Sequence, residues 1–147
     1  MTPVSSGGVE VTALLVCREI QNTKTGVNVR EILEVVPVLQ LPGEAGPLTF
    51  AAFLRSERPG EAQVSFRIHP IADPSTTLVS LPGRLVVQKG YEGRQTVIGA
   101  GFKTLKVNAP GWFGVEFRVG EQILARTRFL VGVLQRAPAA GALPAKP

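Results

Sequence analysis

Four Pro-Gly pairs divide the chain into short segments, and this punctuation constrains the fold more than any other feature of the sequence. The pairs occur at 42–43, 59–60, 82–83 and 110–111. Proline presets the φ angle of the second turn position, and glycine supplies the positive φ that a type II turn needs at the third. Because each pair lies between β-prone runs, the pattern predicts short strands joined by tight turns.

The segments between the turns alternate in the way that half-buried strands do. Val64, Phe66 and Ile68 alternate with polar neighbours, and the segment 113–119 repeats the pattern. No segment combines a sustained period of 3.6 residues with helix caps. The sequence therefore predicts strands over nine segments, which are 10–20, 28–38, 48–56, 61–71, 77–81, 84–88, 95–107, 112–119 and 122–133.

The fold class that these segments predict is an all-β, antiparallel two-sheet β-sandwich of about nine strands, either immunoglobulin-like or jelly-roll-like. A closed barrel is the alternative, but strands that are apolar on one face and charged on the other favour the sandwich. The same alternation predicts a core, which consists of Leu15, Val64, Phe66, Ile68, Phe113, Val115, Phe117 and Phe129.

The two ends of the 147-residue chain differ from its middle. Residues 9–134 predict one β-sandwich domain of ordinary size. Residues 1–8 predict a flexible N-terminal arm, and the Pro/Ala-rich residues 135–147 predict a C-terminal arm. The C-terminal arm is interpreted either as a disordered, polyproline-like tail or as an arm that becomes ordered against a partner. We expect a protein partner, or self-association into a homo-oligomer, to engage these arms.

Compartment and membrane association can be addressed from the apolar segments. Cys17, the one cysteine, lies in an apolar run and is interpreted as a small buried hydrophobic residue, which gives weak support for a reducing compartment. The N-terminus lacks the pattern of a secretory signal, and no apolar run approaches the roughly 18 residues that span a bilayer. We expect no membrane partner and a cytoplasmic location, or a virion if the protein is phage-encoded.

The residues that could support catalysis are few. His69 and Asp73, the single histidine and the single aspartate, could form a base with an orienting carboxylate, but a strand end followed by an Asp-Pro turn is favoured. The segment 99–104 contains Gly-x-Gly followed by Lys-Thr, yet it lacks the spacing and the helix of a phosphate-binding loop. We expect no catalytic residue, no metal site and no cofactor, so the protein is predicted not to be an enzyme.

Basic residues are concentrated in the second part of the chain. Residues 1–62 contain five Arg or Lys against seven Glu, whereas residues 63–147 contain eleven Arg or Lys against four acids. Arg118, Arg126, Arg128 and Arg136 form the candidate face for an anionic partner. Nucleic-acid binding needs exposed aromatics beside such residues, and aromatics make up only 6% of the chain. A solvated basic face is therefore favoured over a nucleic-acid interface.

The last hairpin has a register that can be argued from charge and hydrophobicity. A regular two-residue turn at Gly120-Glu121 would put Arg126 and Arg128 on the apolar face, which is costly. A three-residue connection or a bulge avoids this conflict. On the outer face, the three-residue connection pairs Glu116 with Arg126, Gly114 with Arg128 and Arg118 with Leu124. On the apolar face, it pairs Val119 with Ile123, Phe117 with Ala125, Val115 with Thr127 and Phe113 with Phe129.

Three stretches resemble a bacterial and phage-associated family of small immunoglobulin-like β-sandwich proteins whose function is uncharacterised. They are the apolar run 13–20 with its loop ending at Gly26, the segment His69-Pro70-Ile71-Ala72-Asp73-Pro74, and the segment 107–117 with the final strand to Val131. The family pattern often has an acidic residue after the cysteine, where this chain has Arg18. The resemblance implies a fold and no activity.

Together these features favour a non-enzymatic structural or protein-binding β-sandwich module. A more specific hypothesis is an accessory or decoration protein of a larger particle, such as a phage capsid. The alternative is a nucleic-acid or polyanion-binding protein that uses the basic C-terminal half.

Overall fold

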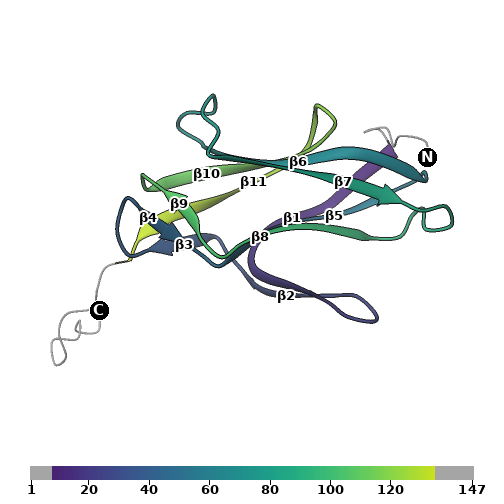
Figure 1. Cartoon of the computed structure of the whole chain (residues 1–147), viewed down its shortest axis with the longest axis horizontal. Helices are drawn as coiled ribbons and strands as arrows, with labels where there is room; N and C mark the ends of the chain where they lie inside the picture. Colours follow the sequence, from purple (N-terminus) through teal and green to yellow (C-terminus); the bar gives the residue numbers. More distant parts are fainter. Residues whose placement is uncertain (1–7, 135–147) are drawn as a thin grey trace.

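The protein is all-β in a computed structural model that describes residues 8–134 (Figure 1). Eleven strands occur in this part of the chain, and both predicted arms lie outside it except for Gly8. The strands are β1 (Val9–Asn22), β2 (Val27–Ile32), β3 (Val35–Val38), β4 (Gly43–Ala45), β5 (Leu48–Ser56), β6 (Gly60–Pro70), β7 (Val79–Val87), β8 (Thr96–Phe102), β9 (Leu105–Val107), β10 (Gly111–Val119) and β11 (Gln122–Val133).

The strands form two larger sheets and one small one. The four-stranded sheet has the order β2-β1-β5-β8, the five-stranded sheet has the order β3-β11-β10-β6-β7, and β4 pairs with β9. The two larger sheets lie face to face, as in a β-sandwich (Figure 1). The prediction of about nine strands in two purely antiparallel sheets was too simple. A third sheet is present, and β3 runs parallel to β11.

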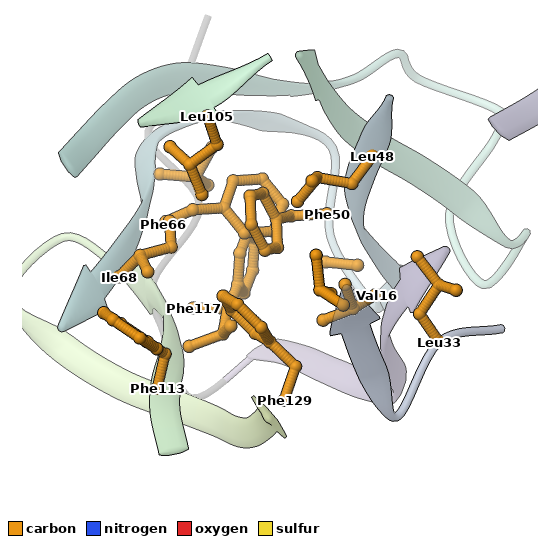
Figure 2. Close-up of a cluster of buried hydrophobic side chains, with 14 of the residues drawn as sticks. Val16, Leu33, Leu48, Phe50, Phe66, Ile68, Leu105, Phe113, Phe117 and Phe129 are labelled. Carbon is orange, nitrogen blue, oxygen red and sulfur yellow. The ribbon is translucent and has the colours of Figure 1, made fainter. Parts of the chain in front are cut away.

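The core lies between the two larger sheets and is rich in phenylalanine (Figure 2). Phe50 of β5 and Phe129 of β11 meet across it with ring centroids 5.8 Å apart. Phe66 and Phe117, on neighbouring strands, have centroids 5.1 Å apart. Such tilted aromatic pairs contribute about 0.5–1.5 kcal/mol beyond the burial of their area. Apolar side chains from both sheets therefore hold the two layers together.

Leu15 is the one incorrect member of the predicted core, because the other seven residues are buried in the central cluster. A β-bulge between Val11 and Ala13 reverses the alternation along β1. Before the bulge Val9 and Val11 face the core, and after it Val16 does. Leu15 is left on the opposite face and is only partly buried.

The predicted strand 28–38 is in fact two strands that belong to different sheets. The chain leaves β2 of the four-stranded sheet and enters β3 of the five-stranded sheet through Leu33 and Glu34. Glu31 has a φ of 52°, which bends the end of β2. Leu33 is 8% exposed and covers the edge of the core at this crossing. The apolar pattern that suggested one strand therefore marks a change of sheet.

The Pro-Gly pairs behave in different ways. Gly60 and Gly111 have φ angles of 139° and 123° and begin β6 and β10, so these two pairs interrupt the strands as predicted. Pro82-Gly83, by contrast, lies inside β7 and makes no turn. Among residues 8–134, β7 is an edge strand that pairs with β6 alone, so a proline can be accommodated where its missing N–H would face away from the sheet.

Two short strands were not predicted as separate elements. The predicted strand 95–107 is divided into β8 and β9, and β9 pairs with β4 instead of joining the four-stranded sheet. Gly99 and Gly101 lie within β8, as expected for a strand of small residues. Residues 99–102 of the segment that resembles a phosphate-binding loop therefore belong to β8, and residues 103–104 connect β8 to β9.

Candidate functional site: the basic face of the five-stranded sheet

The hairpin of β10 and β11 has most of the predicted register. Glu116 pairs with Arg126, Gly114 with Arg128 and Phe117 with Ala125. Beyond Phe117 the register shifts, so Arg118 pairs with Ile123 and the predicted pairs of Arg118 with Leu124 and of Val119 with Ile123 are wrong. The chain uses the two-residue turn together with a bulge, which keeps the arginines away from the core.

Adjacent strands add two further residues to the same outer face. Strand β6 pairs with β10 so that Arg67 lies opposite Glu116 and His69 lies opposite Gly114. The neighbours of these residues in β6 and β10 point into the core, because the alternation is strict over both segments. We call this surface, formed by Arg67, His69, Gly114, Glu116, Arg118, Arg126 and Arg128, the basic face.

Glu116 is the centre of the basic face. Its Oε1 lies 3.0 Å from Nη2 of Arg118 and 3.5 Å from Nη1 of Arg67. Its Oε2 lies 3.7 Å from Nε2 of His69 and 3.8 Å from Nε of Arg126. The side chains around it leave the residue only 7% exposed, although it is on the outer face of the sheet. One carboxylate is thus shared among three guanidinium groups and an imidazole.

The environment of Glu116 favours its charged form. Burial by itself raises the pKa of this carboxyl, but the hydrogen bond from Arg118 and the charges of Arg118, Arg67 and His69 together hold it below its ordinary value. Arg67 is fixed in turn by Thr77, whose Oγ1 accepts a hydrogen bond from its Nε at 2.8 Å, and by the carbonyl of Pro74. The Glu116 cluster is therefore an ordered network that also braces the loop after β6.

A hollow opens beside this network, and Gly114 and Glu116 are among the residues that line it. Its volume is about 630 Å³, and its walls include His69, Ile71, Pro74 and Arg128. A Cβ atom on Gly114 would lie 2.7 Å from Nε2 of His69, so the imidazole ring occupies the place of that side chain. The hollow combines apolar walls with cationic ones, a combination that suits a ligand with both characters.

Arg126 and Arg128, which both line the hollow, are less engaged with Glu116 than Arg67 and Arg118 are. The Arg126 side chain is 69% exposed and only its Nε approaches Glu116. The guanidinium of Arg128 lies 4.3 Å from the ring centroid of Trp112, and among residues 8–134 it has no ion-pair partner. A cation–π contact with Trp112 does not use the N–H groups of Arg128 as hydrogen-bond donors to an acceptor oxygen, so these groups can still donate hydrogen bonds to a ligand. These two groups are the cations most able to bind a ligand.

The structure brings together three of the four arginines predicted from the sequence. Arg118, Arg126 and Arg128 share the basic face, whereas Arg136 lies outside the described residues. Sequence reasoning missed Arg67 and the role of His69 as a neighbour of Glu116. The alternation along β6 was a usable signal for the face of Arg67, but the adjacency of β6 and β10 is not written in the local sequence.

The other candidate residues have structural surroundings. Asp73 accepts hydrogen bonds from Ser75 and Thr76, and these lower the pKa of its carboxyl. His69 contacts Glu116 instead of Asp73, so the turn interpretation of Asp73 is the one supported. Cys17 is 0% exposed, as predicted, and burial raises the pKa of its thiol. Within residues 8–134 no three His, Cys, Asp or Glu side chains come together in a way that could hold a metal ion.

Comparison with known proteins identifies solved structures of similar fold but no matching family. No protein-family profile matches the chain, and no curated protein sequence matches it. A search of solved structures finds a DNA-bound alkylpurine DNA glycosylase from Pseudomonas fluorescens, with a TM-score of 0.52, 15% identity and 84% of this chain covered. The chain spans 30% of the glycosylase's length.

Two further similar structures have lower TM-scores. One is an immunoglobulin-like protein from Pseudomonas aeruginosa, with a TM-score of 0.43, 12% identity, and coverage of 84% of this chain and 96% of that one. The other is a β-glucosidase from Listeria innocua, with a TM-score of 0.46, 14% identity, and coverage of 86% of this chain and 16% of that one. At these identities the comparisons concern the fold alone.

Across the described part of the chain, no helix has the length and apolar character needed to cross a bilayer.

Proposed function

We propose that this protein is a non-enzymatic binding module that recognises an anionic partner protein through the basic face. The observation that carries this proposal is the charge imbalance around Glu116. The basic face carries one carboxylate and four arginines; three of these arginines approach Glu116, and Arg126 and Arg128 retain hydrogen-bonding capacity. An excess of positive charge on a rigid sheet attracts anionic groups and orients them.

A protein partner is favoured over a nucleic acid by the small number of available cations. Arg67 and Arg118 already donate hydrogen bonds to groups of this chain. A phosphate backbone is held by a row of unpaired cations, and single strands also need several stacking aromatics. Trp112 is the aromatic residue that the described part of the chain places beside these arginines, and Arg128 covers its ring.

The nucleic-acid alternative retains one argument, which is the contact between Trp112 and Arg128. An aromatic ring beside an arginine is a common element of single-strand binding sites. The similar glycosylase was solved with DNA, but a likeness at 15% identity concerns the fold and does not transfer that activity. This alternative is therefore tested together with the proposal.

The finer hypotheses from the sequence stay predictions. They are an immunoglobulin-like or jelly-roll-like class for the sandwich, a cytoplasmic or virion location, and a role as an accessory or decoration protein of a larger particle. The contact role of the arms 1–8 and 135–147 concerns segments that lie outside the described residues, except for Gly8. None of these hypotheses is needed for the binding experiment.

The experiment uses the fluorescence of Trp112, the only tryptophan in the chain. The full chain is titrated with poly-L-glutamate and, separately, with single-stranded DNA of matched charge. The double variant R126A/R128A is compared with the control R30A/R84A, which removes two exposed arginines that pair with Glu19 and Glu61 instead of Glu116 and changes the net charge equally. Because fluorescence could change with the Trp112 contact itself, sedimentation gives a second measurement of binding.

We expect poly-L-glutamate to bind and R126A/R128A to weaken it by roughly tenfold or more, as the loss of charge-assisted hydrogen bonds predicts. The control should stay within about twofold of the wild type. Equal losses in the two double variants, or no binding of poly-L-glutamate, would contradict the proposal. Tighter binding of DNA with a steep salt dependence would select the nucleic-acid alternative.

A further inference from the structure

The hollow over Gly114 has the features of a site for one specific chemical group. We propose that it binds a single carboxylate of the partner protein, from an acidic side chain or a chain end, together with the apolar atoms next to it. This inference rests on the proposed function and narrows it from a charged surface to a defined pocket.

The position of the hollow is set by one cross-strand row. Arg128, Gly114 and His69 lie side by side on β11, β10 and β6. The imidazole ring of His69 occupies the place that a Gly114 side chain would take, and all three residues of this row line the hollow. The row therefore places a guanidinium and an imidazole in the wall of the same hollow.

Two cations at the hollow are placed to hold a carboxylate. Arg126 and Arg128 lie two residues apart on the same face of β11, and that spacing corresponds to about 7 Å along a strand. Both residues line the hollow. A carboxylate between them could accept hydrogen bonds from both guanidinium groups, and each guanidinium is a planar donor fork that matches carboxylate oxygens.

The remaining walls select against more highly charged ligands. Glu116 lines the hollow and is held in its charged form by the surrounding cations, so each added negative charge on a ligand is repelled by it. A monoanionic carboxylate meets less repulsion here than a dianionic phosphate. Ile71 and Pro74, which follow the end of β6, offer apolar contact in the same hollow. An acidic residue flanked by apolar ones matches both walls.

The test begins with wild-type protein and two blocked tripeptides, acetyl-Leu-Glu-Leu-amide and acetyl-Leu-Gln-Leu-amide. Binding is followed by ¹⁵N NMR of the full chain, with inorganic phosphate as a third ligand. We expect the Glu peptide to shift the amide signals of Gly114, Thr127 and Arg128, and to bind roughly tenfold tighter than the Gln peptide. Equal binding of the two peptides, tighter binding of phosphate, or shifts confined to other parts of the sheet would overturn the proposal.

A glycine pair provides a matched variant and control. Gly114→Ala places a methyl group 2.7 Å from Nε2 of His69, so the ring, which lines the hollow, must shift. Gly132→Ala makes the same change on β11, four residues after Arg128, at a position where no atom lies within 4 Å of the added methyl group. We expect G114A to lose most of the Glu-peptide affinity and G132A to keep it. Unchanged affinity in a folded G114A would overturn the proposal.

The two proposals fail in distinguishable ways. If R126A/R128A loses its affinity for poly-L-glutamate while G114A binds the Glu peptide like wild type, the proposed function is supported and the proposed carboxylate site in the hollow is wrong. If R126A/R128A and the control R30A/R84A bind poly-L-glutamate equally, the proposed function itself is wrong. Should G114A fail to fold, the wild-type signal shifts and the comparison of the Glu and Gln peptides still decide the matter.

Discussion

Replacing Glu116 by glutamine removes the one negative charge at the centre of the basic face while keeping its size. The change leaves three arginines and a histidine within 4 Å of a neutral amide, because each now approaches a carboxylate oxygen at between 3.0 and 3.8 Å. Removal of one member of a fully buried ion pair costs about 3–5 kcal/mol. The Arg126 side chain is 69% exposed, so solvent screens part of the resulting repulsion. We therefore expect E116Q to lower the free energy of unfolding by about 1–3 kcal/mol.

The pH dependence of this loss is a sharper test than its size. The pKa of Glu116 is lower in the folded protein than its ordinary value of 4.5, so its charge stabilises the fold above that value. As the pH falls through the folded-state pKa, Glu116 becomes protonated and this stabilisation is lost. The difference in unfolding free energy between wild type and E116Q should therefore be full near neutral pH and should shrink in acid.

Urea unfolding at a series of pH values measures that difference directly. Glu121→Gln is the matched control, since it removes an exposed carboxylate with no hydrogen-bond or ion-pair partner in the described part of the chain. The control should change stability by less than about 0.5 kcal/mol at every pH. A stability of E116Q equal to that of the control near neutral pH, or a difference that grows in acid, would refute the reasoning.

Two further predictions concern the core and the ends of the chain. Phe117 is 0% exposed and packs on Phe66, so Phe117→Ala should lower the free energy of unfolding by about 3–5 kcal/mol in urea denaturation, and a loss under about 1 kcal/mol would contradict its place in the core. Deletion of residues 1–8 and 137–147 should leave the melting temperature of the isolated monomer nearly unchanged, because these segments lack periodic apolar residues, and should weaken any assembly seen by light scattering. A large fall in monomer stability would show that the ends belong to the fold.

Local sequence patterns could predict the faces of strands and one hairpin. Charge and hydrophobicity in 113–129 were enough to place Arg126 and Arg128 outside and Phe117 inside, because an error in register would bury arginine. The same patterns could not predict that β6 lies beside β10, since strand order depends on contacts between distant segments. For this reason Arg67 and His69 were not assigned to the site.

The incorrect predictions have local physical causes. The bulge in β1 inserts one residue and reverses the face of everything after it, so Leu15 was misplaced. Pro82-Gly83 has the composition of a turn, but an edge strand can accommodate a proline, and its position at the edge is a property of the whole sheet. Composition shows where a turn can form, and the surrounding sheet determines whether one does.

The parallel pairing of β3 with β11 affects how the chain can fold during synthesis. Within the described part of the chain, residues 35–38 pair in a sheet with residues 130–133 alone, which lie near its end. Such long-range pairing slows folding, because a large loop must close before the contact contributes stability. On the ribosome, β3 and the edge of β10 that pairs with β11 stay unpaired until β11 emerges. Chains released before residue 122 would expose two unpaired edges beside a half-covered aromatic core, which makes them substrates for chaperones or proteases.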